Sequence, residues 1–465
     1  MDEFEKILNS FSGDEKIRFE KFLNSPFFNE DKKIIEVYNR YKTENQNKEV
    51  TKNEISKLVS LADRFLAEIK LDKNQYLKNK LIIQESISRK LFSKTEHYLN
   101  INEDLTSEDN NDGEENLFRK YETYANYWSH LLSQNKNYLG YDFNILALEY
   151  LIIFSIVESV KLSMNIIGSE LRFEEAPKPT FGKYYLKELN MDSLVNFLRE
   201  NNSPNSLIVD IYNKIFKSIL FLRSKEYFIS LMETIEANFD RLEKSVRANV
   251  LTNTYNICLF RSKFNRAFYK KKLFEINKLL IKSGIYDERN KEFMSLAMFT
   301  STLRNAIWNK ELEWADKFVD ECIIFLEPEM RSNMKIYSNA YLSYARKNYE
   351  KTLEELERIE LNFRPLEYQV RLLRINCSYE LSQYTKVKEY LGEFSKFLDL
   401  KEKEYYFGVN AYVNYINTLN KILDIKTGKK NFDEKMFDDL KSKDDIANKE
   451  WLLLKLEEIK NSSVG

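Results

Sequence analysis

A chain of 465 residues is longer than one compact core usually supports, so we expect several domains or an open array of repeats. Its 10 glycines and 6 prolines compare with roughly 30 and 20 at average usage, and this scarcity of turn formers excludes a β-sandwich, barrel or propeller. The 72 basic and 73 acidic residues leave a formal net charge of -1, so no overall field attracts nucleic acid or an anionic membrane.

Most of the chain carries apolar residues at three- and four-residue spacing with Glu and Lys between them, the pattern of amphipathic helices. Ser12 with Glu15, and Thr51 with Glu54, each fit a capping box, so helices are expected to begin there. The first of these helices is expected to end at Asn24, before the Pro26 that disfavours further helix. The same spacing predicts helices over 30–43, 73–91 and 94–105.

An acidic stretch interrupts this pattern between residues 101 and 118. It holds seven acidic residues and no basic one, interleaved with Asn, Ser and Gly, and such a composition predicts a solvated loop. An acidic recruitment segment is the functional alternative. Helices are expected to follow over 115–135 and 143–171, and a connector with two prolines over 173–182.

The segment from Ile145 to Ile167 has apolar side chains on every face, which predicts a helix surrounded by other helices. It also contains Glu149 and Glu158, two carboxylates that invite an acid–base interpretation. A helix turns about 100° per residue, so these two side chains lie on opposite sides and form no catalytic pair. Glu158 is instead expected to meet Lys161, one turn further on.

From about residue 204 a unit of two helices and a short break recurs. Each unit has an aromatic residue or leucine followed three positions later by a small or apolar residue. The pairs are Tyr227 with Ser230, Phe264 with Ala267, Leu312 with Ala315, Tyr349 with Thr352, and Tyr384 with Val387, at intervals of 37, 48, 37 and 35 residues. Because a helical hairpin cannot cover its own apolar face, repeated hairpins predict an α-solenoid.

The clearest unit, residues 339–356, resembles the turn between the two helices of a tetratricopeptide repeat. It departs from that pattern at Lys347, where the repeat has a glycine, and at Thr352, where it has a small residue. A wider likeness is carried by Phe19–Asn29, Asn253–Cys258, Trp314 with Phe318, and Trp451–Leu456. Through these residues nearly the whole chain is similar to a family of all-helical bacterial proteins of unassigned function. The resemblance implies an architecture and no activity.

These patterns predict an all-α protein in which an N-terminal helical bundle is followed by a tetratricopeptide-like α-solenoid of helical hairpins. The predicted divisions are a bundle with its acidic loop, a connector and helix, the repeats, and C-terminal capping helices. They cover residues 1–172, 173–203, 204–424 and 425–465.

Known catalytic and ligand-binding motifs are missing from the sequence. The closest glycines, Gly168 and Gly182, are 14 residues apart, whereas a Walker loop, a dinucleotide-binding loop or a nucleophile elbow needs two within about six residues. His97 and His130 have no metal-ligand spacing and are expected at the surface or at helix ends. We therefore expect no enzymatic activity, no cofactor and no metal site.

Three features bear on location. The 3 cysteines are far apart and give neither a disulfide framework nor a metal motif. The first residues do not fit a signal peptide, and the uncharged stretches are too short to span a bilayer. A cytoplasmic protein without membrane insertion is expected.

The surface of the repeats is the remaining candidate for function. In tetratricopeptide repeats the groove is lined mainly by first-helix positions four and three residues apart. Transferring that spacing gives the candidates Thr252, Asn256, Arg304, Tyr337, Tyr341, Tyr344, Asn376, Tyr379, Asn410, Asn414 and Asn417. Such a stripe suits hydrogen bonding to an extended peptide. The alternative is that the tyrosines pack between repeats and the asparagines cap or bridge helices.

The leading hypothesis is a non-enzymatic scaffold or adaptor that binds a protein or peptide segment of unknown identity along this face. Binding of nucleic acid or a phosphate ligand is the alternative, through a basic helix face within residues 261–272. Its members are Arg261, Lys263, Arg266 and Lys270. A single basic stripe in a neutral protein is more often a solvated face, so nucleic acid is the less favoured partner.

Overall fold

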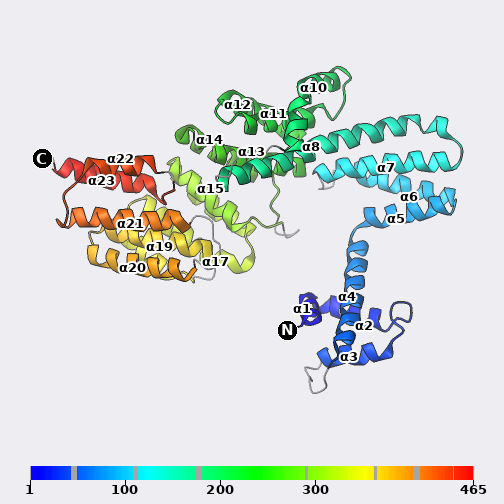
Figure 1. Cartoon of the computed structure of the whole chain (residues 1–465), viewed down its shortest axis with the longest axis horizontal. Coiled ribbons are helices and arrows are strands. Elements are labelled where there is room, and N and C mark those ends of the chain that lie inside the picture. Colours follow the sequence, from blue (N-terminus) through cyan, green and yellow to red (C-terminus); the bar gives the residue numbers. More distant parts are fainter. Residues whose placement is uncertain are drawn as a thin grey trace. The chain divides into compact units, whose positions relative to one another are not determined.

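The computed structural model describes residues 2–42, 50–107, 113–173, 180–262, 264–287, 292–360, 364–401, 409–443 and 445–463. Across these ranges the protein forms 23 α-helices and no β-strand, so the all-α prediction is confirmed (Figure 1). The chain divides into two compact units, Met1–Val250 and Leu251–Gly465. The two units are defined by which residues contact each other in space. They do not test the four divisions predicted from the sequence, which stay predictions.

Unit 1 begins with a small cluster of helices around an aromatic core. Phe4 and Phe19 are fully buried there, and Phe65 packs against Phe19 with 5.1 Å between ring centroids. Both predicted capping boxes are confirmed, because the Ser12 and Thr51 hydroxyls each accept from the backbone N–H three residues on. The helices are α1 (Glu3–Ser10), α2 (Gly13–Leu23), α3 (Lys32–Lys42) and α4 (Lys52–Lys73).

Four helices follow and pack in chain order, α5 (Gln75–Ser88), α6 (Phe92–Ser107), α7 (Gly113–Ser133) and α8 (Tyr141–Phe173) (Figure 1). The loop predicted over 101–118 is corrected, since α6 and α7 occupy its two ends and residues 108–112 lie outside the described part. Burial of Glu114 explains the difference. Its carboxylate is 4% exposed and accepts from the Tyr212 hydroxyl and the Asn249 amide. One of the seven acidic residues in this stretch, Glu114, is therefore part of the protein interior.

Helix α8 is not surrounded as the sequence suggested. Its buried face includes Val157 and Val160, but Leu148 and Leu162 on the opposite face are each 59% exposed. The prediction was wrong because apolar periodicity shows which faces are suited to contact and cannot show whether a neighbour covers them. The expected Glu158–Lys161 pair is confirmed at 2.7 Å.

The rest of unit 1 consists of shorter helices. They are α9 (Phe181–Glu188), α10 (Met191–Glu200), α11 (Ser206–Leu220), α12 (Lys225–Ala237) and α13 (Lys244–Arg261), the last of which continues into unit 2. Of these, α9 and α11 pack on α8, while α10 and α12 pack on α11. Helix α11 forms the centre of this group, and Ile211, Tyr212 and Ile215 on it are fully buried. It therefore ties α10 and α12 to α8.

Unit 2 consists of successive antiparallel helix pairs, α14 (Arg266–Lys282), α15 (Leu296–Trp308), α16 (Leu312–Cys322), α17 (Pro328–Ala345), α18 (Tyr349–Leu356), α19 (Arg364–Glu380), α20 (Tyr384–Lys401), α21 (Val409–Lys426), α22 (Glu434–Ser442) and α23 (Lys449–Ser463). From α14 to α21 each helix packs on the next, α23 packs on α21 and α22, and the alternate helices α15, α17 and α19 also touch. Two successive apolar clusters, the first spanning Phe274–Leu373 and the second Tyr368–Ile459, form the interior.

Three of the predicted hairpin turns share one backbone geometry. Each first helix ends with a residue in the left-handed region, with φ of 62° at Lys310, 62° at Lys347 and 58° at Ser382. The next N–H then bonds back to the carbonyl five residues earlier, which is the Schellman arrangement. These bonds join Glu311 to Ala306 at 3.0 Å, Asn348 to Ser343 at 2.9 Å and Gln383 to Ser378 at 2.9 Å. Lys347 thus takes the conformation for which the repeat pattern uses glycine.

Candidate functional site

Unit 2 contains a cavity of about 420 Å³, called here the unit 2 cavity. Side chains from alternate helices of the array, α15, α17, α19 and α21, form its wall, and the starts of α14 and α23 complete it. The lining residues are Arg266, Arg304, Trp308, Tyr341, Tyr344, Gln369, Leu372, Leu373, Asn376, Ala411, Tyr412, Ala447, Asn448, Lys449 and Glu450. Aromatic rings, amides and cations thus face one space.

Four of the groove candidates come together on this wall. Arg304 lies on α15, Tyr341 and Tyr344 on α17, and Asn376 on α19. They converge because α15, α17 and α19 are the first helices of successive hairpins and contact each other. The spacing transferred from the repeat pattern therefore found the central part of the cavity.

The other candidates lie elsewhere. Tyr337 and Tyr379 are corrected from groove to core, since they are 3% and 5% exposed and pack among apolar side chains. Asn414 donates to the Asp445 carbonyl at 2.8 Å, as the capping alternative expected. The remaining candidates are exposed and do not line the cavity; they are Thr252, Asn256, Asn410 and Asn417.

Arg304 is the cation at the centre of the wall. The buried face of α15 carries Phe299, Leu303 and Asn305, which places Arg304 on the flank of the helix. Its guanidinium lies 5.3 Å from the centre of the Trp308 ring, one turn further along. Among the described residues nothing accepts a hydrogen bond from the buried Arg304 Nε, and no carboxylate pairs with the guanidinium. Arg304 is partly exposed, and such a cation without a counter-charge favours an anionic or carbonyl-rich ligand.

Tyr341 and Tyr344 add two phenol groups beside this cation. Burial raises the pKa of Tyr341, with the nearby Arg304 charge acting in the opposite direction, and burial holds the pKa of Tyr344 well above its usual range. Both rings therefore remain neutral O–H donors at physiological pH. The Tyr344 oxygen accepts from the Asn376 amide at 3.4 Å, which leaves its proton available to an acceptor in the cavity.

Asn376 fixes this part of the wall. It is 2% exposed, and its carbonyl oxygen accepts from the Tyr415 hydroxyl at 2.7 Å while its NH2 group reaches Tyr344. Tyr415 itself is fully buried on α21. Asn376 therefore couples α17, α19 and α21 through one amide, and its polarity serves the positioning of Tyr344.

The basic helix face merges with the rim of the cavity and is largely neutralised. Arg266 Nε and Lys270 Nζ lie 3.1 Å and 2.7 Å from the same Glu450 oxygen. Arg261 is corrected from surface to core, since it is fully buried and its Nε donates to the Tyr269 hydroxyl at 2.8 Å. Lys263 lies outside the described residues. Phosphate or nucleic-acid binding by this face stays a prediction that these contacts do not favour.

Several wall residues were not predicted. Trp308 lies four residues after Arg304 on the same helix face, and Gln369 lies seven before Asn376, so helical periodicity alone would have found both. Tyr412 receives a hydrogen bond from Gln369 at 3.3 Å and belongs to α21, one hairpin further on. Glu450 is 180 residues from its partner Lys270, and nothing local in the sequence indicates that meeting.

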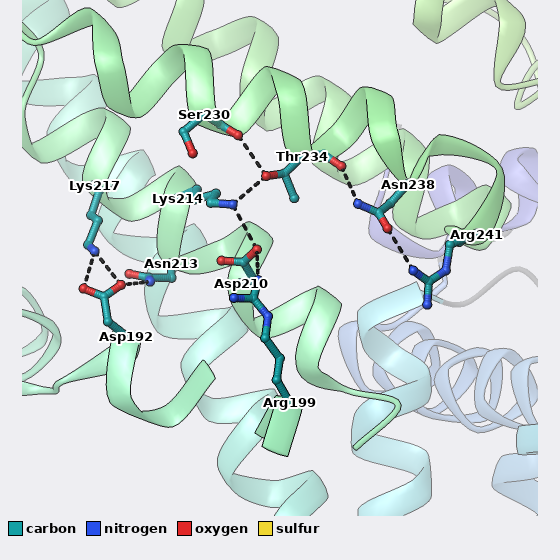
Figure 2. A network of polar contacts seen from close by, with 10 residues as sticks. All are labelled: Asp192, Arg199, Asp210, Asn213, Lys214, Lys217, Ser230, Thr234, Asn238 and Arg241. Carbon is teal, nitrogen blue, oxygen red and sulfur yellow. Dashed lines mark hydrogen bonds and ion pairs between the residues drawn. The ribbon is translucent and has the colours of Figure 1, made fainter. Parts of the chain in front are cut away.

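A second polar cavity, of about 540 Å³, lies in unit 1 between α10, α11 and α12. Figure 2 shows a polar network at and beside this cavity in which two acids, Asp210 and Asp192, are paired with cations. Asp210 accepts from Arg199 at 2.7 Å and from Lys214 at 3.0 Å. Asp192 accepts from Lys217 at 2.6 Å, and this bond lowers the pKa of Asp192. We assign this network to the packing of three helices, since its acids each have a cation.

His130 lies in the last turn of α7, as the helix-end prediction expected, but it is buried and not at the surface. It is 1% exposed, and its Nε2 lies 3.3 Å from a Glu96 oxygen and 2.7 Å from the Gln134 amide nitrogen. Glu96 is 58% exposed, so the pair is not a buried acid–base dyad. Within the ranges that the structure describes, no group of His, Cys, Asp and Glu has the arrangement of a metal site, and no helix has the length and apolarity to cross a bilayer.

Comparison of the chain with protein-family models gave no match, and comparison with curated proteins and with solved structures gave no significant one. The geometry of the unit 2 cavity is therefore the basis for inferring a function.

Proposed function

We propose that unit 2 is a tetratricopeptide-like array of helical hairpins that binds a segment of another protein in the unit 2 cavity, and that the protein acts as a scaffold or adaptor without catalysis. Three observations support the array. The hairpin turns repeat one geometry, alternate helices touch, and those alternate helices supply the cavity wall. Repeats that stack in this way generate an extended surface on one side.

Arg304 is the observation that carries the proposal. A guanidinium stacked on Trp308 and lacking a carboxylate partner among the described residues is pre-organised for an acceptor from outside the chain. Tyr341 and Tyr344 add neutral hydroxyl donors on the adjacent helix. The wall thus offers more donors than acceptors at its centre.

The ligand that fits this chemistry is an extended peptide segment with an acidic side chain. Its carboxylate would meet Arg304, its backbone carbonyls would accept from Tyr341 and Tyr344, and its apolar atoms would cover Trp308 and Tyr412. A cavity of about 420 Å³ has the size of sites that hold a few side chains. Glu450 at the rim disfavours a second acidic residue at that end of the segment.

A peptide array tests the proposal. The purified protein is applied to peptides of random sequence in which one position is varied among Asp, Glu, Asn, Gln and Lys, and the best binder is measured by fluorescence anisotropy. Arg304→Ala is expected to weaken binding of that acidic peptide about 10- to 100-fold, since a hydrogen bond to a charged group contributes roughly 1.5–3 kcal/mol.

Arg371→Ala is the matched control. Arg371 also stacks on an aromatic ring, with its guanidinium carbon 4.4 Å from the centre of Phe397, and its Nε also has no partner among the described residues. It does not line the cavity. Equal loss of binding in both variants, or an array without preference for an acidic position, would contradict the proposed site.

A further inference from the structure

An uncovered apolar stripe runs along α8 in unit 1. Its large members are separated by four and three residues, and their side chains are between 39% and 69% exposed. They are Tyr141, Ile145, Leu148, Ile152, Leu162 and Ile166. Between Ile152 and Leu162, the two positions that continue this spacing are occupied by Ser155 and Ser159. We call these eight positions the α8 stripe.

The spacing of the α8 stripe is that of a coiled-coil seam. Steps of 4, 3, 4, 3, 4, 3 and 4 residues place the eight positions on one line, as in the a and d positions of a heptad repeat. From Tyr141 to Ile166 the line is about 38 Å long, at a rise of roughly 1.5 Å per residue. The opposite face of α8 already packs within unit 1, with Val157 and Val160 fully buried. The helix therefore has two apolar faces, and one of them lacks a partner among the described residues.

The area of the α8 stripe matches what a dimer needs. With a fully exposed Leu, Ile or Tyr side chain taken as roughly 150–200 Å², the six large residues expose about 500 Å² in one chain. Two such stripes in contact bury on the order of 1,000–1,200 Å², which is near the lower end of stable protein interfaces. A patch of this size is at the upper limit for a monomer surface.

We propose that the α8 stripe is the contact between two copies of this chain, with the two α8 helices packed antiparallel about a two-fold axis midway between Ile152 and Ser155. In this register each position pairs with another position of the α8 stripe in the second copy, so all eight are used. Four kinds of layer result, each formed twice by the symmetry: Tyr141 with Ile166, Ile145 with Leu162, Leu148 with Ser159, and Ile152 with Ser155. Such an interface is isologous, as closed dimers require.

Self-complementarity favours this antiparallel register. Each serine meets a large apolar side chain of the other copy, which fills the space that the serine leaves. In a parallel pair in register, Ser155 would meet Ser155 and Ser159 would meet Ser159, which leaves two adjacent layers without apolar contact. The antiparallel register therefore leaves no layer without an apolar side chain.

The charges beside the α8 stripe permit the same arrangement. Glu149 and Glu158 flank it on opposite sides and are already engaged, Glu149 by Ser203 at 2.9 Å and Glu158 by Lys161 at 2.7 Å. Each acid lies between four and five residues from the axis, so it is about 14 Å along the helices from the same residue of the second copy. This distance exceeds the screening length of roughly 8–10 Å at physiological salt. Glu149 of one copy lies level with Glu158 of the other, but the two-fold keeps each acid on its own flank, so these two project to opposite sides of the helix pair. Like charges therefore do not meet across the interface.

The oligomeric state of the full chain tests the proposal. Sedimentation equilibrium at micromolar concentrations is expected to give twice the chain mass of 55.7 kDa, and Leu148→Glu with Ile152→Glu is expected to return the chain mass. Leu81→Glu is the matched control, because Leu81 is a 46% exposed leucine on α5, outside the α8 stripe. Circular dichroism checks that the variants keep their helix content. A monomer at all concentrations, or a dimer that survives the double variant, would overturn the proposal.

Disulfide trapping tests the register independently of any loss of folding. Leu148→Cys and Ser159→Cys are made as separate chains and oxidised alone or mixed. If the register is antiparallel, only the mixture is expected to give a covalent dimer. Residue 148 of one copy then lies about 17 Å along the helix axis from residue 148 of the other. This distance is well beyond the roughly 7 Å limit between the Cα atoms of a disulfide. The native Cys258, Cys322 and Cys377 are buried and do not interfere. Cross-linking of Leu148→Cys with itself would contradict the antiparallel arrangement.

Discussion

Replacing Asn376 by leucine is expected to destabilise unit 2 through a single lost acceptor. The fully buried Tyr415 hydroxyl donates to the Asn376 carbonyl at 2.7 Å. Without that acceptor the hydroxyl stays desolvated, which costs about 1–3 kcal/mol of unfolding free energy. Tyr415→Phe alone leaves the Asn376 carbonyl without a donor and is expected to cost about 1–2 kcal/mol. The double variant removes both polar groups, so its cost is expected to be smaller than the sum by about 1–2 kcal/mol.

Denaturation with guanidinium chloride, followed by tryptophan fluorescence, measures this coupling. Of the 4 tryptophans, only Trp128 lies in unit 1, so a Trp128→Phe background makes the emission a report on unit 2. The parent chain, the two single variants and the double variant are compared with one common m value, which is the slope of the unfolding free energy against denaturant concentration. Additive losses in the double variant would refute the view that the amide of Asn376 is committed to Tyr415 and thereby orients Tyr344.

Two further predictions concern the stability of unit 2. Burial raises the pKa of Tyr337 and Tyr415 above the ordinary 10.0. The contribution of these two neutral tyrosines to the unfolding free energy of unit 2 is therefore complete below pH 10 and is lost as the pH rises further. The expected loss is about 1.4 kcal/mol per pH unit for each tyrosine, and denaturation midpoints between about pH 9 and 11 should fall less steeply in Tyr415→Phe. An unchanged slope would contradict this. Lys347→Gly is expected to stabilise unit 2 by about 1 kcal/mol, because φ is 62° there; a lower melting temperature would count against it.

Local features of the fold were predictable because their causes lie within a few residues. The boxes at Ser12 and Thr51 follow from one side chain and the N–H three positions away. The three hairpin turns also depend on short-range bonds, and the sequence pattern located them even though Lys347 replaces the usual glycine. Apolar periodicity found the helices because each contributes one face to the interior.

The cavity was only partly predictable, since its details depend on contacts between distant residues. Tyr337 and Tyr341 are one turn apart on α17, and their spacing does not show that the interior covers the first while the second reaches the cavity. The neutralisation of Lys270 requires Glu450 from α23. The exposed face of α8 could not be inferred either, because its apolar pattern is equally suited to an internal neighbour.

Site-specific photo-cross-linking tests the central claim, that the unit 2 cavity binds a protein segment. A benzophenone amino acid replaces Tyr341 on the cavity wall or, as the control, Tyr390 on α20, which is partly exposed and does not line the cavity. Each chain is irradiated with the acidic peptide selected on the array. The proposal predicts a covalent adduct at position 341, mapped by mass spectrometry next to the acidic residue of the peptide, and none at position 390. Equal adducts at both positions, or none at position 341 under saturating peptide, would contradict it.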